Sequence, residues 1–176
     1  MSNLNNPVTF IKNYFSFYTY LDISKYLDMN DFDCILGKGG NGVACKLKNG
    51  KVLKITSSKQ EYDNARILLN NPCDNIVNYY NVSEPKEGIF FIDQDFVEKE
   101  LTINANEEIE KLSNIYDNIT DLKTFIEIIN QLELTYKKDI LNYLNHLFKL
   151  NLYIYDIIYS ENVKMTGNKL IFFDIS

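Results

Sequence analysis

The sequence predicts an α+β fold, in which a five-stranded antiparallel sheet with one helix precedes a mostly helical half. Two observations lead to this class. Short strand-like segments, separated by turn signals, fill residues 32–56 and 76–96. Between residues 106 and 148, apolar residues instead recur at helical spacing. A chain of 176 residues has room for one ordinary domain or for two small lobes that share a cleft.

Composition limits the classes of partner. The net charge of −6 argues against nucleic acid as the main ligand. No apolar run approaches the roughly 20 residues that span a bilayer, and the N-terminus lacks a signal-peptide pattern. We therefore expect a cytoplasmic protein without a membrane partner. Three cysteines without metal-ligand spacing predict reduced thiols. His146 is the only histidine, which excludes sites built on several histidines, and we expect it to be structural.

The first half is expected to hold the sheet. Residues 1–30 carry an apolar stripe that predicts a helix packed on the domain: Phe10, Tyr14, Phe17, Tyr18 and Leu21. Residues 32–56 predict two or three antiparallel strands with a hairpin turn at Asn49-Gly50. Ser57 and Ser58 are suited to cap a helix that we expect from Lys59 to Asn70. Two further strands are predicted, Ile76–Val82 and Ile89–Phe96, with a turn over Ser83–Gly88.

The second half is expected to begin with a connection over Lys99–Asn106 and to continue as three helices. Asn106 with the two acids after it predicts a helix start, for a helix through about Ile119. Thr120-Asp121 starts a second helix, and Thr135 caps a third. The third helix carries a regular apolar stripe: Ile140, Leu141, Leu144, Leu147 and Phe148. A short hairpin is expected over residues 164–169.

A glycine-rich segment carries the strongest functional signal. Gly37, Gly39 and Gly42 form a G-x-G-x-x-G pattern, and Lys54 follows on the next strand but one. Backbone without side chains can approach a phosphate closely, and a lysine on a nearby strand can reach α- and β-phosphates. The same glycines occur in dinucleotide-binding folds, but there the loop opens a helix, whereas here strand-like residues continue to a hairpin turn. A glycine-rich hairpin without a ligand is the remaining alternative.

The segment resembles the nucleotide-binding lobe of the protein kinases, and a second segment extends the resemblance. Residues 150–163 hold Asp156 and Asn162 in a pattern similar to the kinase catalytic loop H-R-D-L-x-x-x-N. Asp174 then follows an apolar strand, as does the metal-binding D-F-G. The resemblance implies a two-lobe kinase fold: a helical extension (1–30), a nucleotide-binding small lobe (31–98) and a reduced helical large lobe (99–176).

The resemblance also implies roles for single residues. ATP would bind under the glycine loop, with Lys54 on its phosphates and Glu61 as the ion-pair partner of the lysine. If the two side chains pointed to opposite faces, Asp63 would be the acid to consider. Asp156 would orient an acceptor hydroxyl and take its proton, and Asn162 and Asp174 would hold Mg²⁺ between the phosphates.

The sequence also departs from the kinase pattern. Ile154 and Tyr155 replace the His and Arg of the catalytic loop, so we expect no activation by phosphorylation of the chain. Asn162 lies one residue farther from Asp156 than in the family. D-F-G is replaced by Asp174-Ile175-Ser176, where the sequence ends, so we expect neither an activation segment nor an A-P-E motif.

Three functions remain open at this point. The first is a minimal kinase that transfers the γ-phosphoryl group of ATP to a Ser or Thr hydroxyl of an unidentified protein. The second is a pseudokinase that acts as a protein-binding module, and the third is a small-molecule kinase. The architecture is similar to minimal kinases of some bacterial effectors and large DNA viruses, for which the location would be the host cytoplasm.

Overall fold

The computed structural model describes residues 27–28, 30–39, 41–86, 88–119, 121–152 and 157–173. The predicted α+β class is confirmed, with a five-stranded antiparallel sheet and four helices in these residues. The first part contains β1 (Phe32–Lys38), β2 (Gly42–Leu47), β3 (Lys51–Thr56), α2 (Lys59–Asn70), β4 (Tyr79–Lys86) and β5 (Ile89–Asp95). The second contains α3 (Ile103–Tyr116), α4 (Leu122–Gln131), α5 (Lys137–Lys149), the 3₁₀ turn η2 (Ser160–Asn162), β6 (Val163–Thr166) and β7 (Lys169–Phe172).

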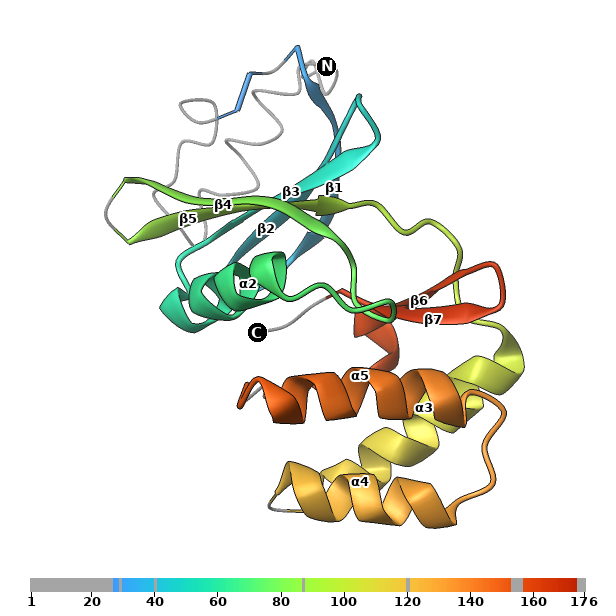
Figure 1. Ribbon diagram of the computed structural model, residues 1–176. Helices are drawn as coiled ribbons and strands as arrows, with labels where there is room; N and C mark the ends of the chain where they lie inside the picture. The colour runs from blue at the N-terminus through green and yellow to red at the C-terminus, as the bar shows by residue number, and fades with distance from the viewer. Residues whose placement is uncertain are drawn as a thin grey trace.

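The sheet has the strand order β1-β2-β3-β5-β4, and α2 packs beside it (Figure 1). Alternate side chains of a strand point to opposite faces, so each strand divides its residues between two environments. One face forms an apolar cluster of Leu27, Phe32, Val43, Cys45, Leu53 and Ile55. Burial raises the pKa of the Cys45 thiol to about 12, which keeps this cysteine neutral. On the other face, Phe90 stacks on Tyr62 of α2 with ring centroids 4.5 Å apart.

The helices and the β6–β7 hairpin form a second core below the sheet (Figure 1). The hairpin lies against α5, where Tyr143 stacks on Phe172 with ring centroids 3.8 Å apart. The predicted stripe of the third helix is confirmed at Ile140, Leu144 and Leu147, which are fully buried. The prediction was wrong for Phe148, the last residue of the stripe, because this residue is half exposed.

The fourth strand begins later than predicted. Ile76 and Val77 leave the sheet and bind β7 instead: the Val77 N–H donates to the Phe172 carbonyl at 2.9 Å, and the Phe172 N–H donates to the Asn75 carbonyl at 2.9 Å. The buried Asn75 amide also donates to the Leu170 carbonyl at 2.9 Å. β4 therefore begins at Tyr79. This connection joins the sheet to the helical part through backbone hydrogen bonds.

Two predicted helix starts were also wrong. The Thr102 hydroxyl, not Asn106, caps α3 by accepting from the Ala105 N–H at 3.2 Å. Thr135 does not cap α5. The Glu108 carboxylate of α3 instead accepts from the N–H groups of Thr135 (2.7 Å) and Tyr136 (3.1 Å), so a side chain from another helix satisfies the amides that precede α5.

The predicted helix within residues 1–30 lies largely outside the described residues. In the part of the chain that the structure covers, no helix is long and apolar enough to cross a membrane.

Candidate functional site

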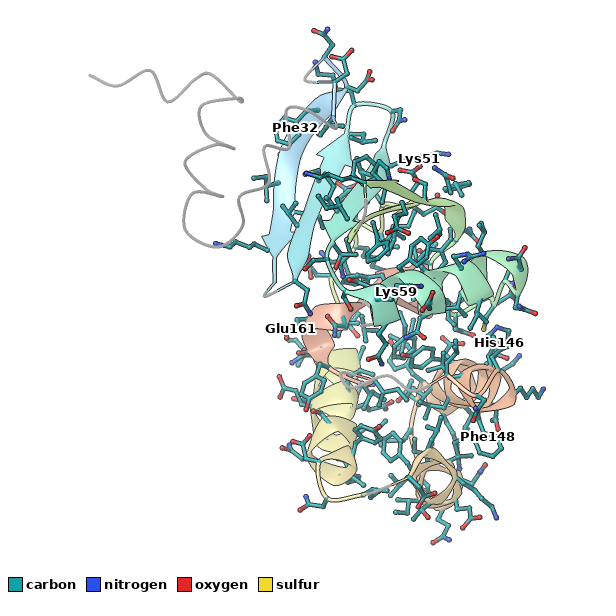
Figure 2. All side chains as sticks on the ribbon, turned by 90° about the vertical axis from the view of Figure 1, so that its left-hand side faces the viewer. Phe32, Lys51, Lys59, His146, Phe148 and Glu161 are labelled. Carbon is teal, nitrogen blue, oxygen red and sulfur yellow. The ribbon has the colours of Figure 1, made fainter. Side chains whose placement is uncertain are left out.

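A cleft of about 630 Å³ lies below the sheet. Its opposite wall is formed by η2, by Lys164 of β6 and by Phe173. Its upper wall comes from the glycine-rich loop and from β2, β3 and β5: Leu36, Gly37, Lys38, Gly39, Asn41, Gly42, Val43, Ala44, Val52, Lys54 and Gln94. Its inner end and lower wall comprise Glu61, Asp95, Phe96, Val97, Glu100, Ser160, Glu161, Asn162, Lys164 and Phe173. Glu161 lies below the ends of β1 and β2 in Figure 2.

The glycine-rich loop is a closed hairpin that is tied to the β3–α2 connection. The Gly39 N–H donates to the Gly42 carbonyl at 3.0 Å. The Asn41 carbonyl at the tip accepts from the Ser57 N–H (2.8 Å), the Ser57 hydroxyl (3.1 Å) and the Thr56 hydroxyl (3.3 Å). The loop is therefore fixed over the cleft by the same residues that start α2.

The fold requires only one of the three glycines of the pattern. A Cβ on Gly42 would collide with the Ile55 carbonyl oxygen and lie 2.8 Å from the Thr56 Cα, so the pairing of β2 with β3 demands glycine. A Cβ on Gly37 or Gly39 would meet nothing within 4 Å, and neither has a positive φ. The fold does not explain these two glycines, which leave open space at the wall of the cleft.

Lys54 and Glu61 form an ion pair, as predicted. The lysine side chain is 16 % exposed and the glutamate side chain 6 %. Ser58 caps α2 by accepting from the Glu61 N–H at 3.2 Å, which places the glutamate in the first helical turn. A glutamate in this position ordinarily turns back to the backbone N–H of the cap residue. Here the Thr56 hydroxyl accepts from the Ser58 N–H at 3.1 Å, so the Glu61 carboxylate is available to Lys54.

We predict that Thr56→Val lowers the free energy of unfolding by about 1–2 kcal/mol. Thr56 is fully buried, and valine has nearly the same shape but cannot bond the Ser58 N–H or the Asn41 carbonyl. Urea unfolding measures the change. Ser57→Ala is the matched control, because Ser57 is exposed and its backbone N–H still holds the loop tip. Equal losses in the two variants would contradict the role given to Thr56.

In the lower wall, Asn162 lies next to Phe173, the residue that precedes the predicted metal ligand Asp174. The Phe173 N–H donates to the Asn162 carbonyl at 3.1 Å. The Tyr159 hydroxyl donates to Asp117 at 2.8 Å, which ties η2 to the end of α3. Lys164 of β6 forms an ion pair with Glu100 across this wall.

The structure brings all of the predicted site residues that it describes to one cleft. Gly37, Gly39, Gly42, Lys54, Glu61 and Asn162 all line it. Asp156 and Asp174 lie outside the described residues. No group of three or more His, Cys, Asp or Glu side chains suited to a metal occurs in the described part of the chain. His146, labelled in Figure 2, lies on α5. Its Nε2 is 2.8 Å from the Asn71 carbonyl oxygen, which ties α5 to the end of α2.

Sequence reasoning did not assign most of the other lining residues to a site, among them Gln94, Glu100 and Lys164. The period of two in β5 carried a signal for Gln94, since this residue pairs with Val52, two positions from Lys54. No comparable local signal pointed to the other two, because their ion pair joins segments 64 residues apart.

The fold and the cleft define an α+β protein with a glycine-rich hairpin over an ion pair between a largely enclosed lysine and a buried glutamate. A scan against protein-family models found no match. A search of the curated proteins also found none.

Proposed function

We propose that the chain is a two-lobe, kinase-like protein that binds ATP in the cleft and transfers its γ-phosphoryl group to a Ser or Thr hydroxyl of a partner protein. One observation carries the proposal: the glycine-rich loop, the Lys54–Glu61 pair and Asn162 converge on one cleft. Asn162 is far from the other parts in sequence, and phosphoryl transfer requires all of them on the same ligand.

The upper wall is suited to a triphosphate. Gly37 and Gly39 leave room for close approach of phosphate oxygens, and the Lys54 ammonium supplies positive charge at low exposure. A buried charge acts through a lower effective dielectric than an exposed one. Glu61 is itself held by the α2 cap, so it fixes the direction of the lysine. The fixed direction of the Lys54 side chain supports a role in phosphate binding rather than a purely structural role.

The lower wall is suited to a hard cation. Asn162 lines the cleft; an asparagine side chain carries an amide oxygen, and Mg²⁺ prefers oxygen ligands. By resemblance to kinases, Asp174 would be the second ligand, and the bound Mg²⁺ would neutralise charge on the phosphates. Asp156 would accept the proton of the acceptor hydroxyl by the same resemblance.

The test is ATP binding with and without Mg²⁺, followed by radiolabelled phosphoryl transfer. We predict that Asp156→Asn lowers transfer by about 10²–10⁴-fold and spares ATP binding, because a base acts only on the acceptor. Asp174→Asn should reduce Mg²⁺-dependent binding, because it removes a charged ligand. A wild-type protein that binds no ATP under either condition would refute the proposal.

A second candidate is a pseudokinase that acts as a protein-binding module. The replacement of the catalytic-loop His and Arg by Ile154 and Tyr155 favours it. In this case the double variant Asp156→Asn/Asp174→Asn would retain the cellular effect of the protein. Loss of that effect in a folded double variant would favour the enzyme.

A further inference from the structure

One face of the sheet is buried although no helix that the structure describes packs on it. Its centre is formed by cross-strand neighbours of β2 and β3, where Val43 pairs with Ile55 and Cys45 pairs with Leu53. Cys45 is 0 % exposed and Ile55 is 2 % exposed. The apolar cluster on this face contains Leu27 and residues of β1, β2, β3 and β5, and it includes no residue of the four described helices.

The described helices lie elsewhere. Alternate residues of a strand point to opposite faces, and Phe90 stacks on Tyr62 of α2 on the other face of β5. In Figure 1, α3, α4 and α5 lie below the sheet. A side chain on an open sheet face keeps its outer end in water, because neighbouring strands shield only its flanks. The burial of Cys45 and Ile55 therefore requires a further segment on their face.

Only one stretch outside the described residues is long enough to cover this face. Residues 1–26 precede Leu27, whereas each of the other such stretches holds at most four residues. Leu27 is itself buried and belongs to the apolar cluster. The chain therefore already lies on this face where its described part begins.

The sequence of residues 1–26 matches the face in chemistry and in width. An α-helix with its side chains is about 10–12 Å wide, and neighbouring strands are about 4.8 Å apart, so one helix covers two strands. The burial of the cluster follows this width. Residues at the centre, on β2 and β3, are buried, and those around them are only partly buried: Ile35, Leu47, Ile89 and Phe91.

We propose that residues 1–26 dock on this face of the sheet, with the apolar stripe from Phe10 to Leu21 over the β2–β3 ladder. The stripe is then part of the folded domain and is not available as a binding surface for a partner protein. Lys54 lies between Leu53 and Ile55 in the sequence, so its side chain points to the opposite, cleft face. The inference is therefore independent of ATP binding in the cleft.

The Cys45 thiol, at the centre of the face, can report the docking. The chain contains three cysteines, and all three thiols are free. The background Cys34→Ser/Cys73→Ala leaves Cys45 as the only thiol. Alkylation by a maleimide under native conditions, followed by mass spectrometry, measures how accessible this thiol is.

A pair of double substitutions in this background tests the stripe. We expect Tyr14→Asp/Phe17→Asp to raise the rate of Cys45 alkylation about tenfold or more, because a carboxylate cannot be buried against an apolar face without a partner. Ser16→Asp/Thr19→Asp is the matched control, since it adds the same charge at positions outside the stripe. The control should keep Cys45 protected.

A second measurement does not depend on a destabilising substitution. The photoreactive p-benzoylphenylalanine, placed at Phe17, forms a covalent bond to the groups that it contacts, and peptide mapping identifies them. We expect crosslinks to β2 or β3 of the same chain. Crosslinks to α3, α4 or α5, or to a second copy of the chain, would overturn the proposal.

The alkylation results can overturn it as well. A folded Tyr14→Asp/Phe17→Asp protein that keeps Cys45 protected would show that the stripe does not cover the face. Equal exposure of Cys45 in the control would also exclude the stripe as the cover. Loss of protection on dilution of the protein without these aspartates would show that a second copy covers the face instead.

Discussion

Replacing Lys54 with methionine is expected to lower phosphoryl transfer by about a hundredfold or more, because it removes the least exposed positive charge among the described residues that line the cleft. Removing one preorganised electrostatic group from a site commonly costs 10²–10³-fold in rate. The substitution should also lower the free energy of unfolding by about 1–3 kcal/mol, since it leaves the Glu61 carboxylate buried without its cation. Radiolabelled transfer and urea unfolding measure the two effects.

A double variant separates catalysis from stability. Lys54→Met/Glu61→Gln removes both charges, so no uncompensated carboxylate remains, and most of the lost stability should return. Activity should stay at the level of the single variant, because the charge on the phosphates is still absent. Recovery of transfer in the double variant would show that Lys54 matters only for the fold, and would contradict the proposed function.

Gly42→Ala is expected to destabilise the protein by about 1–3 kcal/mol or more, the cost of overpacking a close-packed position. The added methyl group would collide with the Ile55 carbonyl, which belongs to the β2–β3 ladder and cannot move without breaking it. Gly39→Ala should instead leave the unfolding free energy within about 0.5 kcal/mol of wild type. It should weaken ATP binding, because its methyl group would enter the space offered to the phosphates.

The pair of glycine variants tests the loop without assuming catalysis. Urea unfolding and ATP titration are measured on both, with Gly88→Ala as a control for the general cost of a changed glycine, since Gly88 lies outside the cleft and has a positive φ of 75°. A Gly39→Ala protein that is stable and binds ATP as tightly as wild type would remove the loop from the phosphate site. A Gly42→Ala protein as stable as wild type would show that the β2–β3 contact can relax.

Much of the upper wall could be predicted because its signals are local. Asn49-Gly50 fixes the β2–β3 hairpin through the positive φ of 81° at Gly50, and the hairpin register then sets which strand residues share a face. The short link from β3 to α2 places Glu61 in the first turn of the helix, beside the strand that carries Lys54. The ion pair was therefore predictable from a few neighbouring residues.

The helix starts show where such local signals fail. Asn106 and Thr135 are suitable caps by residue type, but α3 and α5 use Thr102 and the distant Glu108 instead. A capping propensity is worth only about 1 kcal/mol, so the packing of one helix against another decides which side chain reaches the free amides.

The sequence by itself determined the β2–β3 hairpin, the α2 helix and the placement of Lys54 against Glu61, because each depends on contacts within one hairpin or one turn. Only the tertiary structure decided the lower wall of the cleft, where Lys164 meets Glu100, and the departure of Ile76 and Val77 from the sheet to β7. These contacts join distant segments, so they form only after the sheet and the helices dock.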